Sequence, residues 1–136
     1  MQEVYLDSNI LIYGVLNEDQ IGDSARRFIK EIETGKYKAS ISALTIDEFI
    51  WKVQKVLGRE EAAKLADKLM EMQNLKIIDI NLDILKKMLE IYKKYNLDPR
   101  DSIHLAAMQL NEIKIIISQD SDFDKIKDIK RIDFSK

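Results

Sequence analysis

The spacing of hydrophobic residues along the chain predicts strands that alternate with helices. Five short apolar runs are rich in β-branched residues, and each is typical of a buried strand. The runs cover residues 3–6, 38–41, 76–80, 114–117 and 131–134. The fourth run is continuously apolar at Ile115, Ile116 and Ile117 instead of alternating with polar residues. Such a run is expected for a parallel strand that is covered on both faces.

Between these runs, apolar residues recur at spacings of three and four, which predicts amphipathic helices. The predicted helices cover residues 9–16, 25–32, 46–57, 62–69, 85–92 and 99–110. The last of them is apolar on nearly every side, so we expect it to be buried. This alternation predicts a three-layer α/β/α sandwich with right-handed crossovers. No linker or internal repeat interrupts the pattern, so we expect a single domain over residues 1–136.

Composition narrows the class of protein. The chain is 46% hydrophobic, but no apolar run approaches the roughly 18 residues of a membrane span, and its start lacks the features of a signal peptide. We therefore expect a cytoplasmic protein with no membrane partner. The absence of Cys excludes thiolate metal sites and cysteine nucleophiles, and the single His104 excludes a multi-histidine zinc site. Any chemistry must come from oxygen ligands and carboxylates.

Four acids fall where the predicted fold would gather functional groups. In an open parallel sheet, ligands bind outside the carboxyl ends of the strands, where helix N-termini also point. Asp7 ends the first predicted strand and Asp120 closely follows the fourth. Glu48 and Asp101 lie in the first turn of two predicted helices. The fold would therefore bring all four acids to one edge of the sheet.

Each helix acid also has a purely structural interpretation. Thr45 with Glu48 fits a capping box, and Asp101 fits a first-turn acid after a capping residue and Pro99 at the first helical position. A carboxylate there gains about 0.3–1 kcal/mol from the helix dipole. An Asp directly after a buried strand has no such explanation, and its burial costs solvation energy unless a positive group is near. Four acids together therefore favour a site.

A cluster of carboxylates needs a positive partner. Like charges a few ångströms apart raise each other's pKa and oppose folding, whereas a divalent cation reverses the sign of this interaction. An all-oxygen set of Asp and Glu matches Mg²⁺ or Mn²⁺. Such an ion activates water and neutralises charge on a phosphodiester. The predicted chemistry is hydrolysis of a nucleic-acid backbone.

The same residues resemble the motifs of a known family, the PIN-domain nucleases, and within it the small VapC-type toxin ribonucleases. Residues 5–12 (YLDSNILI) resemble the first motif, in which an acid and an Asn two residues later follow strand one. Glu48 matches the helix acid. Residues 100–107 (RDSIHLAA) resemble the third motif and residues 118–123 (SQDSDF) the fourth. In this order the motifs cover nearly the whole chain.

The resemblance implies a five-stranded parallel sheet of order 3-2-1-4-5 and an endoribonuclease that depends on Mg²⁺ or Mn²⁺. It implies RNA as the substrate, a homodimer, and an antitoxin protein that inserts a segment near the site. The implied metal-binding and catalytic acids are Asp7, Glu48, Asp101 and Asp120. Asn9 and Ser118 become polar supports that orient an acid, a water or the scissile phosphate.

The acids next to the four candidates, and His104, could also take part in the site. Asp120 is favoured over Asp122 as the fourth acid because it is nearer the strand end, and Asp122 is expected to cap the turn that follows. Asp47 and Asp98 are assigned to capping and solvent. His104 lies one helical turn from Asp101 and is expected to pack or to form hydrogen bonds, not to act as a general acid.

Two alternatives to the toxin function remain: a housekeeping RNA-processing PIN nuclease, and a PIN-like binding protein with little turnover. The net charge of −2 does not indicate a broad cationic surface for nucleic acid. Without the four candidate acids, however, the balance becomes slightly positive. Trp51 lies well off the apolar stripe of its predicted helix. It fits either a surface for a partner, the antitoxin or RNA, or a side chain that covers the core.

Overall fold

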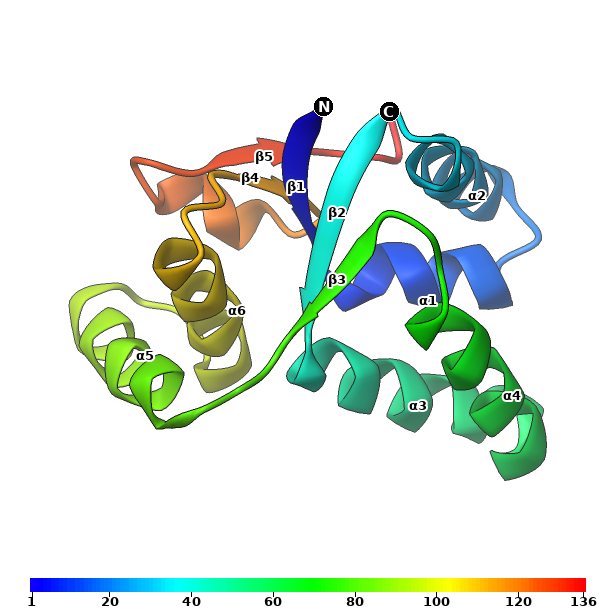
Figure 1. The fold of residues 1–136 in the computed structure, drawn as a ribbon, viewed down its shortest axis with the longest axis horizontal. Coiled ribbons are helices and arrows are strands. Elements are labelled where there is room, and N and C mark those ends of the chain that lie inside the picture. The colour runs from blue at the N-terminus through cyan, green and yellow to red at the C-terminus, as the bar shows by residue number, and fades with distance from the viewer.

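The computed structural model describes all 136 residues and contains one parallel β-sheet. Its five strands have the order β3-β2-β1-β4-β5, so β1 lies at the centre (Figure 1). The strands are β1 (Gln2–Leu6), β2 (Tyr37–Ser42), β3 (Leu75–Ile78), β4 (Ile115–Ile117) and β5 (Lys130–Ile132). The predicted three-layer α/β fold and its strand order are confirmed.

Six α-helices cover the two faces of the sheet. They are α1 (Ser8–Leu16), α2 (Gln20–Glu33), α3 (Ala43–Leu57), α4 (Arg59–Met70), α5 (Leu82–Lys94) and α6 (Pro99–Leu110). Helices α1 to α4 lie on one side, and α5 and α6 lie together on the other (Figure 1). A short 3₁₀ helix, η1 (Ser121–Lys125), follows β4. None of the helices is both long enough and apolar enough to cross a membrane.

Two hydrophobic cores form because neighbouring strand residues point to opposite faces. Val4 and Leu6 of β1 belong to the core under α1 to α4, whereas Tyr5 belongs to the core under α5 and α6. In β4, Ile117 joins the first core and Ile116 the second. Burial on both faces explains why these strands read as unbroken apolar runs.

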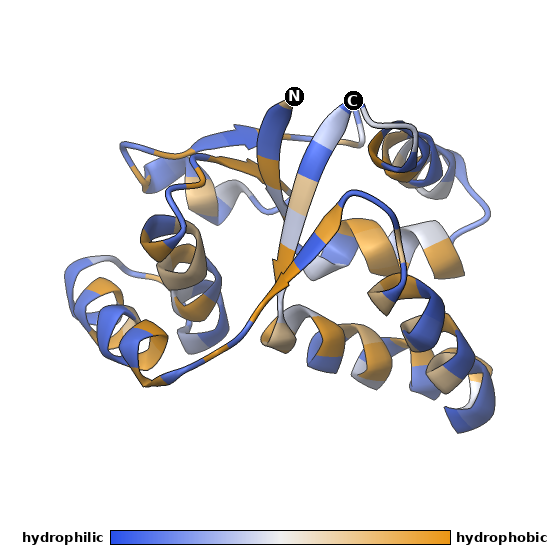
Figure 2. Cartoon of the chain, viewed as in Figure 1, coloured by the Kyte–Doolittle hydropathy of each residue, from blue (hydrophilic) through white to orange (hydrophobic).

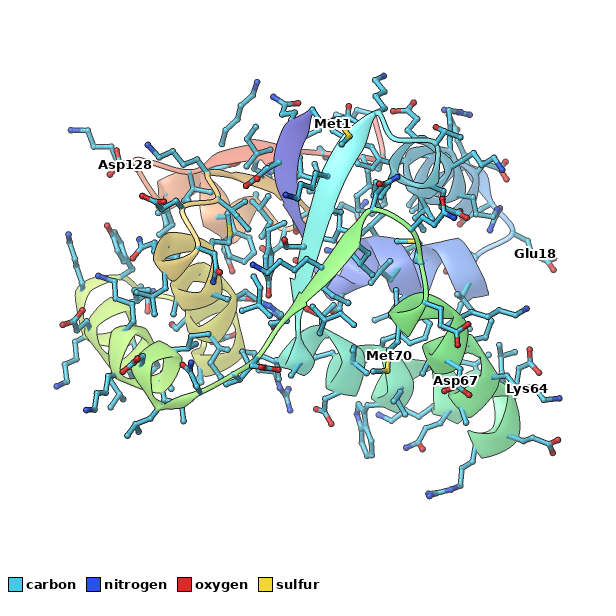
Figure 3. All side chains as sticks on the ribbon, viewed as in Figure 1. Met1, Glu18, Lys64, Asp67, Met70 and Asp128 are labelled. Atoms are coloured by element: carbon cyan, nitrogen blue, oxygen red, sulfur yellow. The ribbon has the colours of Figure 1, made fainter.

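The helices carry hydrophobic and hydrophilic bands along their length, as expected for amphipathic helices with one buried side (Figure 2). On α4, Lys64 and Asp67 are exposed and point away from the sheet (Figure 3). Helix α6 is the exception that the sequence predicts, because its middle turns are buried on nearly every side while its two ends are exposed. Its buried residues are Ser102, His104, Leu105, Ala106, Ala107 and Met108.

The sheet order creates a topological switch point between β1 and β4. The chain builds outward from β1 to β3 on one side and then crosses to β4 and β5 on the other. The loops at the carboxyl ends of β1 and β4 therefore leave in opposite directions and open a crevice between them, where ligands bind in such sheets. Asp7 directly follows β1 and Ser118 directly follows β4, so the fold brings the first and fourth motifs together at this crevice.

Candidate metal centre

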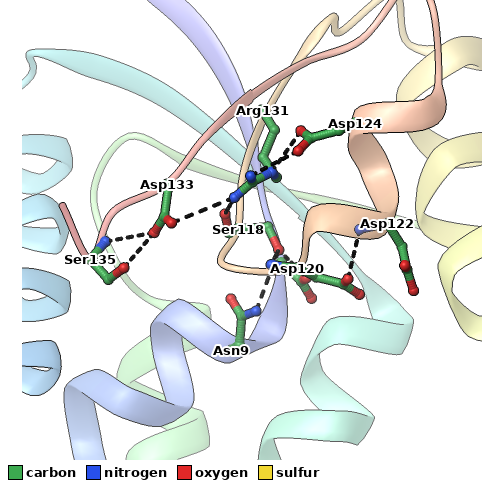
Figure 4. A network of polar contacts seen from close by, with 9 residues as sticks. Asn9, Ser118, Asp120, Asp122, Asp124, Arg131, Asp133 and Ser135 are labelled. Carbon is green, nitrogen blue, oxygen red and sulfur yellow. Dashed lines mark hydrogen bonds and ion pairs between the residues drawn. The ribbon is translucent and has the colours of Figure 1, made fainter.

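Ser118 connects the first and fourth motifs. Its fully buried Oγ donates a hydrogen bond to Asp7 Oδ2 at 2.6 Å. The same oxygen accepts hydrogen bonds from Asn9 Nδ2 at 3.3 Å and from the backbone N–H of Asp120 at 2.9 Å. Figure 4 shows Asn9, Ser118 and Asp120 converging at this point. The hydroxyl therefore fixes Asp7, Asn9 and the start of the fourth motif relative to one another.

Three carboxylates form a cluster near this hydroxyl. One oxygen from each of Asp101, Asp120 and Asp122 lies within 4.8 Å of the other two. Asp101 comes from the first turn of α6, whereas Asp120 comes from the loop after β4 and Asp122 from the first turn of η1. Asp120 Oδ1 accepts a hydrogen bond from the Asp122 backbone N–H at 2.9 Å, so Asp120 caps η1. The expectation that Asp122 caps this turn is therefore wrong, and its carboxylate is free to join the cluster.

Glu48 is held by a chain of buried hydrogen bonds. His104 is completely buried in α6, and its Nε2 lies 2.7 Å from Glu48 Oε1. His104 Nδ1 lies 2.6 Å from the Tyr5 hydroxyl. Burial raises the pKa of Tyr5, so its hydroxyl keeps the proton and can donate it to Nδ1. Nε2 then carries the hydrogen that it donates to Glu48. His104 thus has the hydrogen-bonding role expected from the sequence.

The helix that carries Glu48 begins earlier than the sequence suggests. Helix α3 starts at Ala43 with Ser42 at the N-cap, and Thr45 Oγ1 accepts the Ser42 backbone N–H at 3.1 Å. Thr45 is therefore the third helical residue, and the predicted capping box between Thr45 and Glu48 is wrong. Glu48 lies in the second turn, and the first turn of α3 contains no acid. A capping role no longer explains Glu48.

Asp47 and Asp98 are the two other acids near the site, which the sequence assigns to capping and solvent. Asp98 occupies the N-cap position of α6 before Pro99, as expected, but its side chain makes no capping hydrogen bond. Asp47 and Asp98 are both exposed. Neither acid belongs to the carboxylate cluster.

Burial and mutual repulsion make the cluster unfavourable without a counter-charge. Burial raises the pKa of Asp101 to about 7, and the nearby charges of Asp120 and Asp7 add to this shift. The pKa of Asp7 is also raised, mainly by burial, although the hydrogen bond from Ser118 partly opposes the shift. Asp7 makes no ion pair with Lys or Arg. The protein therefore maintains a negative site at an energetic cost.

These donors fit a hard divalent cation. The cluster offers carboxylate oxygens only, which is the donor type that Mg²⁺ and Mn²⁺ prefer. A second observation supports this fit: the buried Asn9 Oδ1 has no hydrogen-bond partner in the protein. Buried acceptors are almost always satisfied, and a water molecule on a bound cation is one donor that would satisfy this oxygen. Asp101, Asp120 and Asp122 would hold the cation, with Asp7 and Asn9 beside them.

Arg131 is a part of this site that the sequence did not reveal. Its side chain, only 15% exposed, lies on β5. Its Nε and Nη2 donate to the two carboxylate oxygens of Asp124 at 2.8 and 2.9 Å, and Nη1 donates to the Ser118 carbonyl at 3.2 Å (Figure 4). Asp133 lies 3.6 Å from Nη1. Arg131 therefore clamps η1 onto the end of β4. In the sequence it is one basic residue in a basic tail, and no local pattern distinguishes it.

Replacing Arg131 with Gln is expected to weaken Mg²⁺ binding by about 10- to 100-fold, as for other residues that hold metal ligands in place. The loop that carries Asp120 and Asp122 would lose its clamp. Arg131→Lys keeps the charge but not the two-point bond to Asp124, so it should restore little. The affinity is measured from the Mg²⁺-dependent rise in melting temperature. Lys130→Gln, an exposed neighbour on β5, is the control, and an equal loss in that variant would show that only positive charge matters.

The structure brings the predicted acids together to different degrees. Asp101 and Asp120 lie in the tight cluster, and Asp122 joins them. Asp7 lies outside the tight cluster but accepts a hydrogen bond from Ser118, and its charge raises the pKa of Asp101. Glu48 lies outside the tight cluster, but it lines one surface pocket together with Asp101.

The structure places carboxylates at the switch point of a parallel α/β sheet, and sequence comparison identifies the family of this protein. Residues 4–129 match the sequence model of the PIN domain. The chain therefore belongs to the PIN-domain family.

Two curated relatives come from Methanocaldococcus jannaschii. Ribonuclease VapC6 is 27% identical, and the match covers 95% of each chain. Ribonuclease VapC2 is 28% identical over 97% of this chain and 90% of the relative.

Solved structures agree on the fold at lower sequence identity. VapC20 of Mycobacterium tuberculosis, a Sarcin-Ricin loop cleaving toxin, superposes with a TM-score of 0.78 at 13% identity, covering 93% of this chain and 97% of that one. VapBC2 of Rickettsia felis, solved with a DNA fragment from its promoter, gives a TM-score of 0.76 at 15% identity, with 96% and 98% of the chains covered. At these identities the likeness supports the fold alone.

Proposed function

We propose that this protein is a divalent-metal-dependent endoribonuclease and the toxin of a toxin–antitoxin pair. The observation that carries the proposal is the convergence of carboxylates at the crevice between β1 and β4. Membership of the PIN-domain family and the two relatives named as ribonucleases support RNA as the substrate. Mg²⁺ or Mn²⁺ is the proposed ion because every donor is an oxygen.

The residues of the site have distinct proposed roles. A bound divalent cation would stabilise charge on the phosphodiester and lower the pKa of water. Asp101, Asp120 and Asp122 would hold that cation, while Ser118 keeps Asp7 in place. Glu48 uses one oxygen to accept from His104, which leaves Oε2 to orient a water for attack or to accept its proton. His104 is a positioning residue because it acts through Glu48.

The antitoxin and homodimer proposals rest on other observations. Complexes of toxins with antitoxins, from Klebsiella pneumoniae and other bacteria, share this fold. For the homodimer, α5 presents a row of exposed apolar side chains that no other element covers. The row consists of Leu82, Leu85, Leu89 and Tyr92. A second copy of the chain would bury this row.

The central test is cleavage of total cellular RNA by purified protein. We expect Mg²⁺- or Mn²⁺-dependent cuts, no cuts in EDTA, and loss of activity in Asp7→Asn and Glu48→Gln. Asp67→Asn on α4 is the matched control, because it makes the same chemical change at an exposed position away from the crevice. Mapping the new ends identifies the target. Full activity in EDTA would refute the proposal.

A further inference from the structure

A second pocket adjoins the carboxylates on the side of α3. It has a volume of about 320 Å³ and lies between α1, α3 and α6. Its lining residues are Ser8, Ile12, Asp47, Glu48, Trp51, Lys52 and Arg100. A neighbouring pocket shares Glu48 and Arg100 and extends to Asp101. The two pockets therefore form a continuous surface that leads from the acidic cluster to Trp51.

Trp51 is the only tryptophan of the chain, and 54% of it is exposed. It lies one helical turn after Glu48 on α3, so both side chains project to the same side of the helix. The ammonium of Lys55 lies 4.3 Å from the centre of the Trp51 ring, a cation–π contact. The pocket thus combines a large aromatic surface with a positive charge at its edge.

The cations around Trp51 have no acidic partners. Lys52, Lys55 and Arg100 are exposed, and none of them forms a salt bridge. Elsewhere on the surface, Arg26, Lys36 and other basic residues do pair with acids. Unpaired cations beside an exposed aromatic ring can accept an anionic, aromatic ligand without first breaking an ion pair.

A nucleotide has the required chemistry. Proteins that bind single-stranded nucleic acid stack bases on aromatic side chains and contact the backbone with Lys and Arg. A volume of about 320 Å³ is near the lower end of ligand pockets and would suit one nucleotide. A protein segment is the weaker fit, because only Ile12 and Trp51 of the lining are hydrophobic. Asp47 adds an acceptor that an amino group on a base can use.

We infer that this pocket binds one unpaired nucleotide of the RNA substrate, with its base stacked on Trp51 and its phosphate near Lys52 and Arg100. This inference rests on the proposed ribonuclease function, and it specifies the class of substrate as RNA with an unpaired base at the site of cleavage. The enzyme would require a single-stranded base beside the cleaved bond. It would therefore cut loops and unpaired segments in preference to continuous helices.

The kinetic test compares Trp51→Leu with the wild-type protein on a single-stranded RNA. Loss of stacking is expected to raise KM by about five- to a hundredfold. The change in kcat should stay within about threefold, because Trp51 touches no reacting group. Trp51→Phe should restore part of the affinity. Val56→Ala is the control, because Val56 is exposed on the same helix but does not line the pocket. An unchanged KM in Trp51→Leu would overturn the inference.

A binding test needs no turnover, because Trp51 is the sole tryptophan and reports directly on the pocket. An oligoribonucleotide of about six nucleotides should quench its fluorescence in the Asp7→Asn variant, and an abasic ribose-phosphate chain of equal length should not. Equal quenching by both would show that the pocket binds phosphate alone. A response to the antitoxin but not to RNA would assign the surface to protein. Either result overturns the inference, and neither depends on whether the wild-type protein cleaves RNA.

Discussion

Asp101→Asn is expected to abolish RNA cleavage and, at the same time, to make the metal-free protein more stable. The activity should fall about a thousandfold or more, because the several kcal/mol of charge stabilisation from the cation would be lost. The stability should rise because the change removes a charge that burial and two neighbouring acids make unfavourable. These causes raise the pKa of Asp101 to about 7 in the folded protein. Asn has the same shape and carries no charge.

The opposite signs of the two effects separate a functional site from a structural acid. In EDTA at pH 8, the melting temperature of Asp101→Asn should exceed that of the wild type by roughly 3–5 °C, which corresponds to about 1 kcal/mol. Asp83→Asn is the matched control, because Asp83 lies in the first turn of α5 and is exposed. It should lose about 0.3–1 kcal/mol of helix-dipole stabilisation. A fall in melting temperature in both variants would mean that Asp101 only stabilises its helix.

The sequence predicts where a site residue lies when that residue directly follows a strand or begins a helix. A run of apolar, β-branched residues predicts a buried strand. The sequence therefore locates the ends of β1 and β4, and with them Asp7 and Ser118. The parallel order then requires that these ends meet. The sequence predicts helix α6 equally well. Pro99 marks its start, and apolar residues on nearly every side of the helix predict its burial. These features depend on local patterns and on the rules of sheet topology.

The remaining features depend on contacts between distant parts of the chain. Tyr5, His104 and Glu48 form one hydrogen-bonded chain, although 99 positions separate the first pair and 56 the second. No periodicity encodes such a contact. The clamp formed by Arg131 is equally invisible, since its partners lie on η1 and at the end of β4.

The capping residues of α3 and η1 also depend on the surrounding structure. Both Ser42 and Thr45 are good capping residues, and β2 continues to Ser42 before α3 begins. The choice between the two caps depends on where the strand ends in the sheet. Likewise, the nearness of Asp120 to the strand end does not decide which acid caps η1, and only the hydrogen bond from the Asp122 backbone to Asp120 shows that Asp120 does so.

Mg²⁺ is expected to stabilise the protein strongly at pH 8 and about a third as much at pH 5.5. The pKa of Asp101 is about 7 in the folded protein, against 3.8 for an unperturbed Asp. Below about pH 4 both the folded and the unfolded states are protonated. Between pH 4 and 7 only the folded state keeps the proton, so the free energy of unfolding from this group falls as the pH rises. Above pH 7 the carboxylate carries its full charge, and the metal-free protein bears the whole cost.

Divalent metal binding reverses this trend because the cation competes with protons for the same oxygens. At a Mg²⁺ concentration of about a hundred times Kd, the stabilisation should approach about 2.7 kcal/mol at pH 8, which raises the melting temperature by roughly 10 °C. At pH 5.5, about 1.5 pH units below the pKa of Asp101, proton competition should weaken binding about 30-fold, so the rise at the same Mg²⁺ concentration should shrink to roughly 3 °C. Thermal unfolding with Mg²⁺ or with KCl of equal ionic strength separates binding from screening. A rise of equal size at both pH values would place the ion away from Asp101, and Asp101→Asn should remove the pH dependence if the cluster is the site.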